Sequence, residues 1–221
     1  MKKKLFGALL ASMSCASVAQ VGITAGAGTT GISLHASTAI DSGLLNVRLG
    51  VNWLDYEHDF TANNTVYLAD FRLRSFDALL DYFPVRGSFR LTGGLVYNGN
   101  KLDGRGQPST GATFDIGGSV YTAAQVGSVN GSVEFRKIAP YLGIGWGNAA
   151  GQDKGWALSA DLGVLLQGTP RTSVMVSRCT ASELICSRLA EDLAAESAAV
   201  EDEVKRHKVF PVLRVGAIYR F

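Results

Sequence analysis

The sequence predicts an all-β fold, an eight-stranded antiparallel transmembrane barrel of up-and-down topology with a helix in its last outer loop. Three observations carry this prediction. Apolar and polar residues alternate with period two along most of the chain. The connections between these segments are alternately short and long. The last segment, residues 214–221, has one apolar face and one face with two arginines, which suits a barrel wall between lipid and a polar lumen.

The first residues have the pattern of a secretory signal peptide. Met1-Lys-Lys-Lys4 is basic, residues 5–15 are apolar and too few to span a bilayer, and Ser17-Val-Ala19 supplies a cleavage site. We expect residues 1–19 to be removed and residues 20–221 to form one barrel domain. An uncleaved membrane anchor is the alternative. Loss of three lysines changes the net charge from +2 to −1, which gives no electrostatic case for nucleic-acid binding.

The alternating segments divide the remaining chain into eight predicted strands. In the third strand, five apolar residues alternate with Asn46, Arg48, Gly50 and Asn52. In the fourth strand, the charged residues change face near Ser75, which predicts a β-bulge. The eight predicted strands span residues 21–27, 32–38, 45–53, 66–83, 89–100, 133–146, 156–167 and 209–221.

The lengths of the connections favour a membrane barrel over a soluble periplasmic sandwich. The turns after strands two, four and six are short, whereas the connections after strands three, five and seven are longer, and the last two are the longest. A sandwich has no reason to sort its loops by side. Nor does it have a reason to place aromatic residues at strand ends, as membrane interfaces do; these residues are Trp53, Tyr82, Tyr97, Trp146, Trp156 and Tyr219.

Charged residues fill the predicted lumen face. Eight strands enclose a space that side chains nearly fill, so ionised groups there must pair or hold water. Two interpretations stay open: a neutralising plug that makes the barrel rigid, or a selectivity constriction built from facing charges. Six arginines against four aspartates do not indicate a cation filter. The predicted network comprises Arg48, Asp70, Arg72, Arg74, Asp77, Asp81, Arg90, Asp161, Arg214 and Arg220.

The two longest connections contain predicted secondary structure. Residues 113–122 predict a small hairpin with a Gly-Gly turn. Between residues 170 and 208, an apolar stripe at helical spacing predicts a helix, with Thr180 and Glu183 as a candidate capping box. Either this helix packs its stripe on the barrel rim, or it forms a lid or anionic funnel at the mouth. Its outer-loop acidic cluster is Glu196, Glu201, Asp202 and Glu203.

Two cysteines, Cys179 and Cys186, remain after the signal peptide, and an oxidising compartment favours a disulfide between them. Seven positions along a helix separate Cα atoms by about 10 Å. Because a disulfide tolerates about 7 Å, Cys179 must curl back ahead of the helix start. No second Cys or His cluster accompanies this pair, so we expect no metal.

No grouping of residues predicts catalysis or a cofactor. The sequence has no Gly-x-Ser-x-Gly, and no grouping of His with Ser and Glu stands out around His35, His58 and His207. His58 with its acidic neighbours reads as a solvated loop edge. We therefore expect a protein that is not an enzyme and that carries no cofactor.

The chain resembles the CarO family of outer-membrane porins, which are associated with ornithine uptake and carbapenem resistance. The segments concerned are Gly28-Thr-Thr-Gly31, Phe114-x-Ile-x-Gly-x-x-Tyr121, Ile138-Ala-Pro-Tyr-Leu-Gly-Ile-Gly145, and Gly163 followed by Gly168-x-Pro170. A polar, helix-prone insert before the last strand also recurs. The carboxyl-terminal pattern of Gly216, Tyr219 and Phe221 resembles the signal that bacterial outer-membrane barrels present to their assembly machinery.

The resemblance implies an eight-stranded barrel and a role in the permeation of basic amino acids. We expect a passive channel for small solutes in the outer membrane of a Gram-negative bacterium. The alternative is a non-conducting structural, adhesive or binding barrel with a charge-plugged lumen. The expected partners are outer-membrane lipid and lipopolysaccharide, the barrel assembly machinery and periplasmic chaperones, with a small-molecule solute if the barrel conducts.

Overall fold

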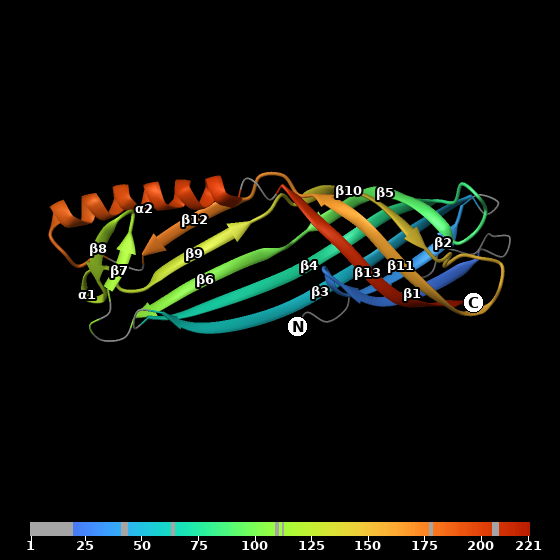
Figure 1. Cartoon of the computed structure of the whole chain (residues 1–221), viewed down its shortest axis with the longest axis horizontal. Helices are drawn as coiled ribbons and strands as arrows, with labels where there is room; N and C mark the ends of the chain where they lie inside the picture. The colour runs from blue at the N-terminus through green and yellow to red at the C-terminus, as the bar shows by residue number, and fades with distance from the viewer. Residues whose placement is uncertain are drawn as a thin grey trace, which may run out of the picture.

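The computed structural model describes residues 20–40, 44–62, 65–108, 111, 113–176, 179–204 and 208–221. The predicted signal peptide, residues 1–19, lies outside the described residues and stays a prediction. The molecule is elongated, with a barrel at one end and a second group of strands and helices at the other (Figure 1). The carboxyl terminus lies at the barrel end.

Eight strands form the closed antiparallel barrel, which confirms the predicted fold class. Each of these strands pairs with the next barrel strand along the chain, and the last, β13 (Val209–Arg220), pairs with the first, β1 (Val21–Gly28), so that Ile23 lies opposite Tyr219. The barrel strands are β1 (Val21–Gly28), β2 (Gly31–Ala39), β3 (Leu45–Ala62), β4 (Thr65–Tyr82), β5 (Phe89–Asn98), β10 (Ile138–Trp146), β11 (Gly155–Leu166) and β13 (Val209–Arg220).

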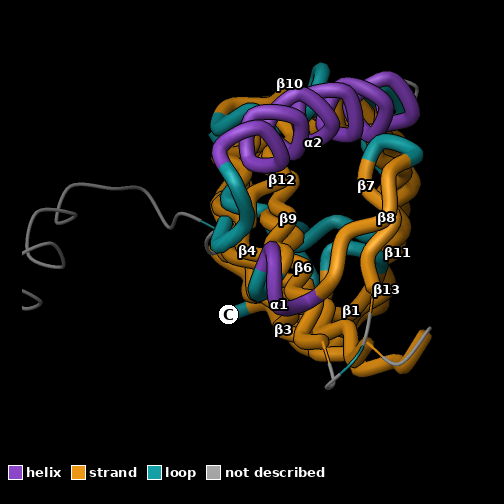
Figure 2. Tube along the Cα trace, turned by 90° about the vertical axis from the view of Figure 1, so that its left-hand side faces the viewer, coloured by secondary structure: helices purple, strands orange, loops and turns teal. Residues whose placement is uncertain are grey.

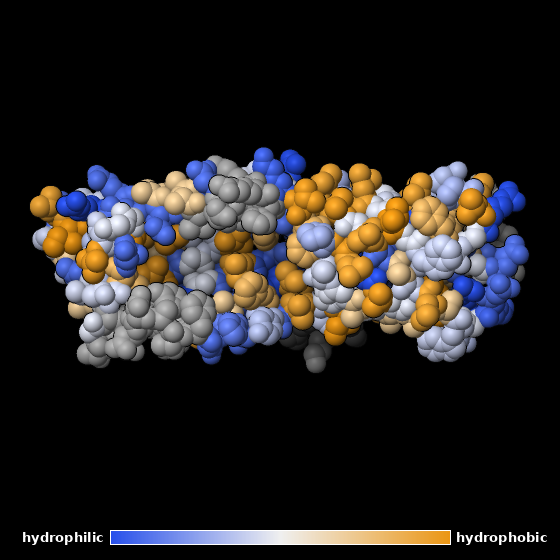
Figure 3. Space-filling view, in the orientation of Figure 1, coloured by the Kyte–Doolittle hydropathy of each residue, from blue (hydrophilic) through white to orange (hydrophobic). Residues whose placement is uncertain are grey.

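The outward face of the barrel is apolar, as the period-two pattern predicts. On β11, Trp156, Leu158 and Leu162 are exposed, whereas Ser159 and Asp161 between them are buried. Figure 3 shows apolar residues gathered over the barrel on the face in view. Aromatic residues mark both barrel ends: Trp53 and Tyr97 at one end, and Tyr82, Trp146, Trp156 and Tyr219 at the end with the carboxyl terminus.

β3 and β4 are 18 residues long each and continue well beyond the barrel. The connection predicted after the third strand is therefore mostly strand. Along β4, β5 pairs with the half inside the barrel and β6 (Lys101–Pro108) with the half outside it. β9 (Val129–Glu134) and β12 (Arg171–Val176) complete what we call the outer sheet, in the order β3-β4-β6-β9-β12. Because β9 is separate, the predicted sixth barrel strand begins at residue 138 rather than 133.

The predicted β-bulge near Ser75 is wrong. Pairing of β3 with β4 keeps one register from Leu45 opposite Tyr82 to Ala62 opposite Thr65. The charged residues change face for another reason: the surroundings of the strand change where it leaves the barrel. The side of β4 that faces lipid in the barrel carries Arg72 and Arg74 in the outer sheet, where both are exposed.

The connection between β6 and β9 contains the predicted hairpin, formed by β7 (Thr113–Ile116) and β8 (Ser119–Thr122), followed by the short helix α1 (Ala123–Val126). The predicted helix is α2 (Glu183–Val204). Viewed along the molecule, α2 lies across β12, and the hairpin stands to one side of the outer sheet (Figure 2). Together they bury a second core of Phe114, Ile116, Tyr121, Val126 and Leu189.

The position of α2 differs from both predicted arrangements. The helix contacts β12 and β7 rather than the barrel rim, and Leu189, Ile185 and Leu193 of its apolar stripe join the second core. Tyr121 donates a 2.6 Å hydrogen bond to Asp192 of α2, which lowers the pKa of that carboxyl. No helix among the described residues is long and apolar enough to cross a bilayer.

α2 also covers the edge of the outer sheet. In the described sheet β12 pairs with β9 on one side, so its other side offers free backbone groups. Ser197 of α2 meets them: its hydroxyl accepts a 3.3 Å hydrogen bond from the backbone N–H of Val174, and its carbonyl accepts one of 3.2 Å from the Thr172 hydroxyl. The helix thus satisfies one backbone group of this edge, the N–H of Val174, and also contacts the Thr172 side chain.

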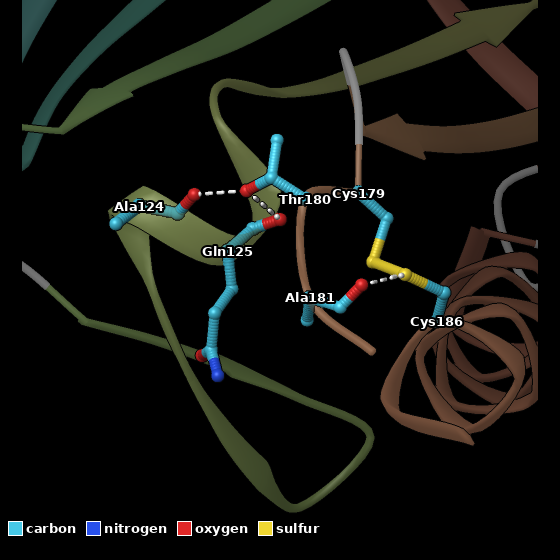
Figure 4. Close-up of a disulfide and its surroundings, with 6 residues drawn as sticks. All are labelled: Ala124, Gln125, Cys179, Thr180, Ala181 and Cys186. Carbon is cyan, nitrogen blue, oxygen red and sulfur yellow. Dashed lines mark hydrogen bonds between the residues drawn. A yellow bond between two sulfur atoms is a disulfide. The ribbon is translucent and has the colours of Figure 1, made fainter. Parts of the chain in front are cut away.

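The structure contains the disulfide between Cys179 and Cys186, with Cα atoms 5.8 Å apart (Figure 4). Cys179 lies four residues ahead of the helix start at Glu183, as the bond requires. The predicted capping box at Thr180 is wrong. The Thr180 hydroxyl donates to the Ala124 carbonyl at 2.5 Å, and its backbone N–H donates to the Gln125 carbonyl at 2.9 Å. The disulfide segment therefore fastens α2 to the α1 turn.

Replacing both cysteines by serine should loosen this fastening while the barrel stays folded. A disulfide that closes so short a loop contributes about 2 kcal/mol, mainly by restricting the unfolded segment. We expect limited proteolysis to cut near residue 180 at least tenfold faster in the variant, with the heat resistance of the barrel unchanged. Equal cleavage rates would show that packing of Leu189 alone holds the helix.

Candidate functional site

The barrel interior contains a first ion cluster built around Arg48. Its guanidinium donates to both carboxylate oxygens of Asp161, at 3.0 and 3.1 Å, and to Asp81 at 3.1 Å. Arg90 reaches Asp161 from the other side at 2.8 Å and donates to the Gly147 carbonyl. The Thr92 hydroxyl adds a 2.6 Å bond to Asp81. The cluster links four strands of the barrel, because β3, β4, β5 and β11 each supply one charged group.

A second ion cluster lies beside the first. Asp77 accepts a 3.0 Å hydrogen bond from His35, forms an ion pair with Arg214 at 3.0 Å, and is fully buried. Arg214 also donates to the Thr30 hydroxyl at 3.0 Å and lies 5.8 Å from the ring centre of Tyr141, a cation–π distance. This cluster joins β2, β4, β10 and β13.

The buried charges of the two clusters balance. Among the described residues, the buried arginines are Arg48, Arg90 and Arg214, and the buried acidic residues are Asp77, Asp81 and Asp161. Each of the six is at most 4 % exposed. A water-sized sphere therefore scarcely reaches any of these six side chains.

An apolar layer accompanies the charges, and except for Tyr141, which the alternation places on the inward face, its members were missed from the sequence. Leu79, Val96, Tyr141, Leu165 and Val212 alternate with lipid-facing residues on their strands, so they point inward, and each is at most 3 % exposed. Ala139 and Phe210 complete the layer. Leucine and valine at inward positions look like lipid-facing residues in a sequence. Only strict counting of alternation from Asp77, Asp161 and Arg214 could have found them.

Four residues of the predicted lumen network lie elsewhere. Asp70, Arg72 and Arg74 belong to the outer sheet, where Arg72 pairs with Asp70 at 2.5 Å and Arg74 pairs with Asp55 at 2.7 Å. These corrections follow from the length of β4, which carries its polar segment out of the barrel.

Arg220 is the fourth, and it sits at the opposite end of the barrel. It donates to the backbone carbonyls of Asn148 and Asp153, at 2.8 and 3.1 Å, and is half-buried. It therefore fastens the turn between β10 and β11 instead of joining the lumen clusters.

The other predicted residues are placed as follows. Gly216 and Tyr219 lie in β13, which closes the barrel, and Phe221 follows directly. The Tyr219 ring lies between Trp156 and Phe221, with ring centres 5.2 and 5.1 Å away. In the acidic cluster, Glu196 accepts a 3.3 Å hydrogen bond from the Gly117 backbone, so this member holds the hairpin turn. Glu201, Asp202 and Glu203 follow in the last turns of α2, and the side chain of Glu203 lies outside the described residues.

The side of the outer sheet continuous with the lipid-facing wall is polar. It carries Arg72, Asp70, Lys101 and Asp103 in adjacent strands, linked by ion pairs of 2.5 to 3.6 Å. A depression of about 630 Å³ lies over these residues. Among the described residues, no group of three His, Cys, Asp or Glu side chains has an arrangement that suits a metal ion.

Comparison with known proteins places the fold. No protein-family model and no curated protein matches the chain. The solved structures of Acinetobacter baumannii CarO2 and CarO each align with a TM-score of 0.57 at 22 % identity, over 91 % of this chain and 98 % of theirs. A major outer membrane protein from Thermus thermophilus aligns at 17 % identity over 93 % of this chain and 100 % of its own, with a TM-score of 0.45. The two CarO structures show that the chain has a CarO-like β-barrel fold.

Proposed function

We propose that this protein is a barrel with a closed resting lumen, which anchors the outer sheet, the hairpin and α2 at the surface of a Gram-negative outer membrane. It then acts as a structural or binding barrel rather than as an open pore. One observation carries the proposal: three arginines and three aspartates cross-link the walls inside the barrel and are almost fully buried.

Two features support the membrane assignment. Exposed apolar side chains follow the outward face along the length of the barrel strands. Aromatic side chains mark both barrel ends, as they do at membrane interfaces. The amino-terminal segment has the pattern of a secretory signal. The proposed partners are outer-membrane lipid and lipopolysaccharide, the barrel assembly machinery acting on the segment that ends at Phe221, and periplasmic chaperones.

The physics of buried ion pairs explains why such a lumen stays closed. Separating Arg48 or Arg90 from Asp161 leaves an uncompensated charge in a space of low polarity, which costs several kcal/mol. A solute that passes must first break at least one of these pairs. The apolar layer around Tyr141 adds a second barrier, since its aliphatic side chains offer no hydrogen bonds to a polar solute.

Conductance in planar bilayers tests the proposal. We expect the natural protein to give no current. A variant with alanine at Arg48, Asp81, Arg90, Tyr141 and Asp161 should give stepwise currents. Because this variant loses two arginines and two aspartates, no buried charge of the first cluster is left without a partner. A matched control replaces Asp70, Arg72, Lys101 and Asp103 of the outer sheet and should stay silent. Regular steps from the natural protein, or silence from the emptied variant, would contradict closure by these residues.

A passive channel for small solutes such as basic amino acids is the second candidate. The motifs shared with the CarO family and the fold likeness to the two CarO structures both favour it. In that case the ion pairs must open transiently. Liposome swelling with ornithine, lysine and a neutral amino acid then distinguishes a selective channel from a closed barrel.

A further inference from the structure

The outer sheet has an apolar face with a cavity that neither the barrel nor the ion clusters explain. This face is the side opposite Arg72 and Lys101, and it carries Phe71, Leu102, Val133 and Thr172 in register across β4, β6, β9 and β12. The hairpin residues Phe114 and Ile116 cover part of it. Beside them a cavity of about 420 Å³ stays open over the sheet.

The floor of the cavity is hollowed by small residues. Ala69, Gly104, Gly131 and Val174 lie side by side on the four strands. A Cβ atom added at Gly131 would meet no heavy atom within 4 Å, and one at Gly104 would meet only the Gly131 carbonyl oxygen, at 3.9 Å. Elsewhere on this face the hairpin packs so closely that Phe114 and Ile116 are 5 % and 4 % exposed. The hollow is thus a local feature of these glycines.

The chemistry of the walls selects the occupant. Aliphatic and aromatic side chains with glycine backbone make up most of the lining, and the charged groups among the lining residues are Arg105, Asp115 and Glu196. Arg105 and Asp115 are exposed, and Glu196 is engaged with the Gly117 backbone. Such walls disfavour a charged solute, since little in the floor could replace its water. The volume is within the range of about 300 to 1,000 Å³ for small-molecule sites.

We propose that this cavity is a binding site for an uncharged apolar molecule, of the class of a long alkyl chain. The alkyl chain of this ligand lies across the Gly104–Gly131 hollow, against Phe71, Leu102 and Phe114. The site does not depend on whether the lumen is closed, because it lies wholly in the outer sheet and hairpin. The alkyl chain has two possible sources, a free hydrophobic molecule or the acyl chain of a membrane lipid.

Photolabelling of the full-length protein in lipid nanodiscs tests the site. In one arm, a long-chain alcohol with a diazirine on its alkyl chain is added from solution. In the other, the diazirine is on the acyl chain of a phospholipid within the nanodisc. We expect label on peptides of β6, β9 and β7 in at least one arm, with barrel peptides labelled from the lipid in the second. The arm that labels the cavity identifies the source.

Filling the hollow provides the decisive variant. G131L should lower the labelling of these peptides at least tenfold while leaving that of the barrel peptides unchanged. The matched control is G87L, a glycine-to-leucine change in the turn after β4, where an added Cβ would make only ordinary contacts with Val85, at 3.8 and 3.9 Å. G104L repeats the test if G131L does not fold. Label confined to the barrel in both arms, or equal cavity labelling in a folded G131L or G104L variant, would overturn the proposal.

Discussion

D161N should be the most damaging conservative substitution in the barrel. Asp161 accepts from both Arg48 and Arg90 and is 4 % exposed, so its loss leaves two buried guanidinium groups short of a counter-charge. Removing one partner of a buried pair typically costs about 3 to 5 kcal/mol. We expect the free energy of unfolding to fall by about 3 kcal/mol, at the lower end of that range, measured from urea midpoints in lipid vesicles.

D55N is the matched control, since Asp55 also pairs with an arginine, Arg74, at 2.7 Å. That pair lies on the outer sheet, where both side chains are more than half exposed. Exposed ion pairs are weakened by water and salt. We expect no measurable shift of the urea midpoint. If D161N and D55N behave alike, the lumen charges are hydrated in the membrane and the closed-lumen proposal loses its basis.

G50A should be nearly as damaging, although it adds a single methyl group. Gly50 lies opposite His35 on the neighbouring strand, and a Cβ at Gly50 would come within 2.1 Å of the His35 ring. Because His35 is buried and held by Asp77, the ring cannot swing into open space. Overpacking and the loss of this hydrogen bond together cost about 2 to 3 kcal/mol. The urea midpoint should fall accordingly.

The double variant H35A/G50A separates the two causes. The three atoms nearest to the added methyl all belong to the His35 ring, so removing the ring removes the clash. We expect the double variant to be more stable, by about 1 kcal/mol or more, than the sum of the single changes predicts. Strict additivity would mean that the methyl group strains the backbone instead.

The barrel itself was predictable because its strands face lipid on one side and the barrel interior on the other, so apolar and polar residues alternate with a period of two. Along β11, every second residue from Trp156 to Leu166 is apolar, and most of the residues between them are small or polar. The same rule misled at Arg72 and Arg74. Beyond the barrel the outward face meets water instead of lipid, so polar residues belong there, and a change of surroundings looks like a β-bulge in the sequence.

The outer sheet was less predictable, for a different reason. β6, β9 and β12 are 6 to 8 residues long, and β6 and β9 contain glycines at the cavity floor, which hide their alternation. Their pairing also depends on contacts distant in sequence, such as Lys101 with Glu134. The hairpin at residues 113–122 was predicted correctly because its turn signal is local.

The contacts that Ser197 makes with β12 affect whether the outer sheet can pair with the same sheet of a neighbouring copy. An uncovered strand edge presents unpaired backbone groups, and these can pair with the same edge of a neighbouring copy. Here α2 contacts the β12 edge. The opposite edge, β3, carries the carboxylates of Asp55, Glu57 and Asp59 at alternate positions, and these would repel the same carboxylates of a second copy. Both edges of the outer sheet therefore carry features that disfavour pairing with a second copy.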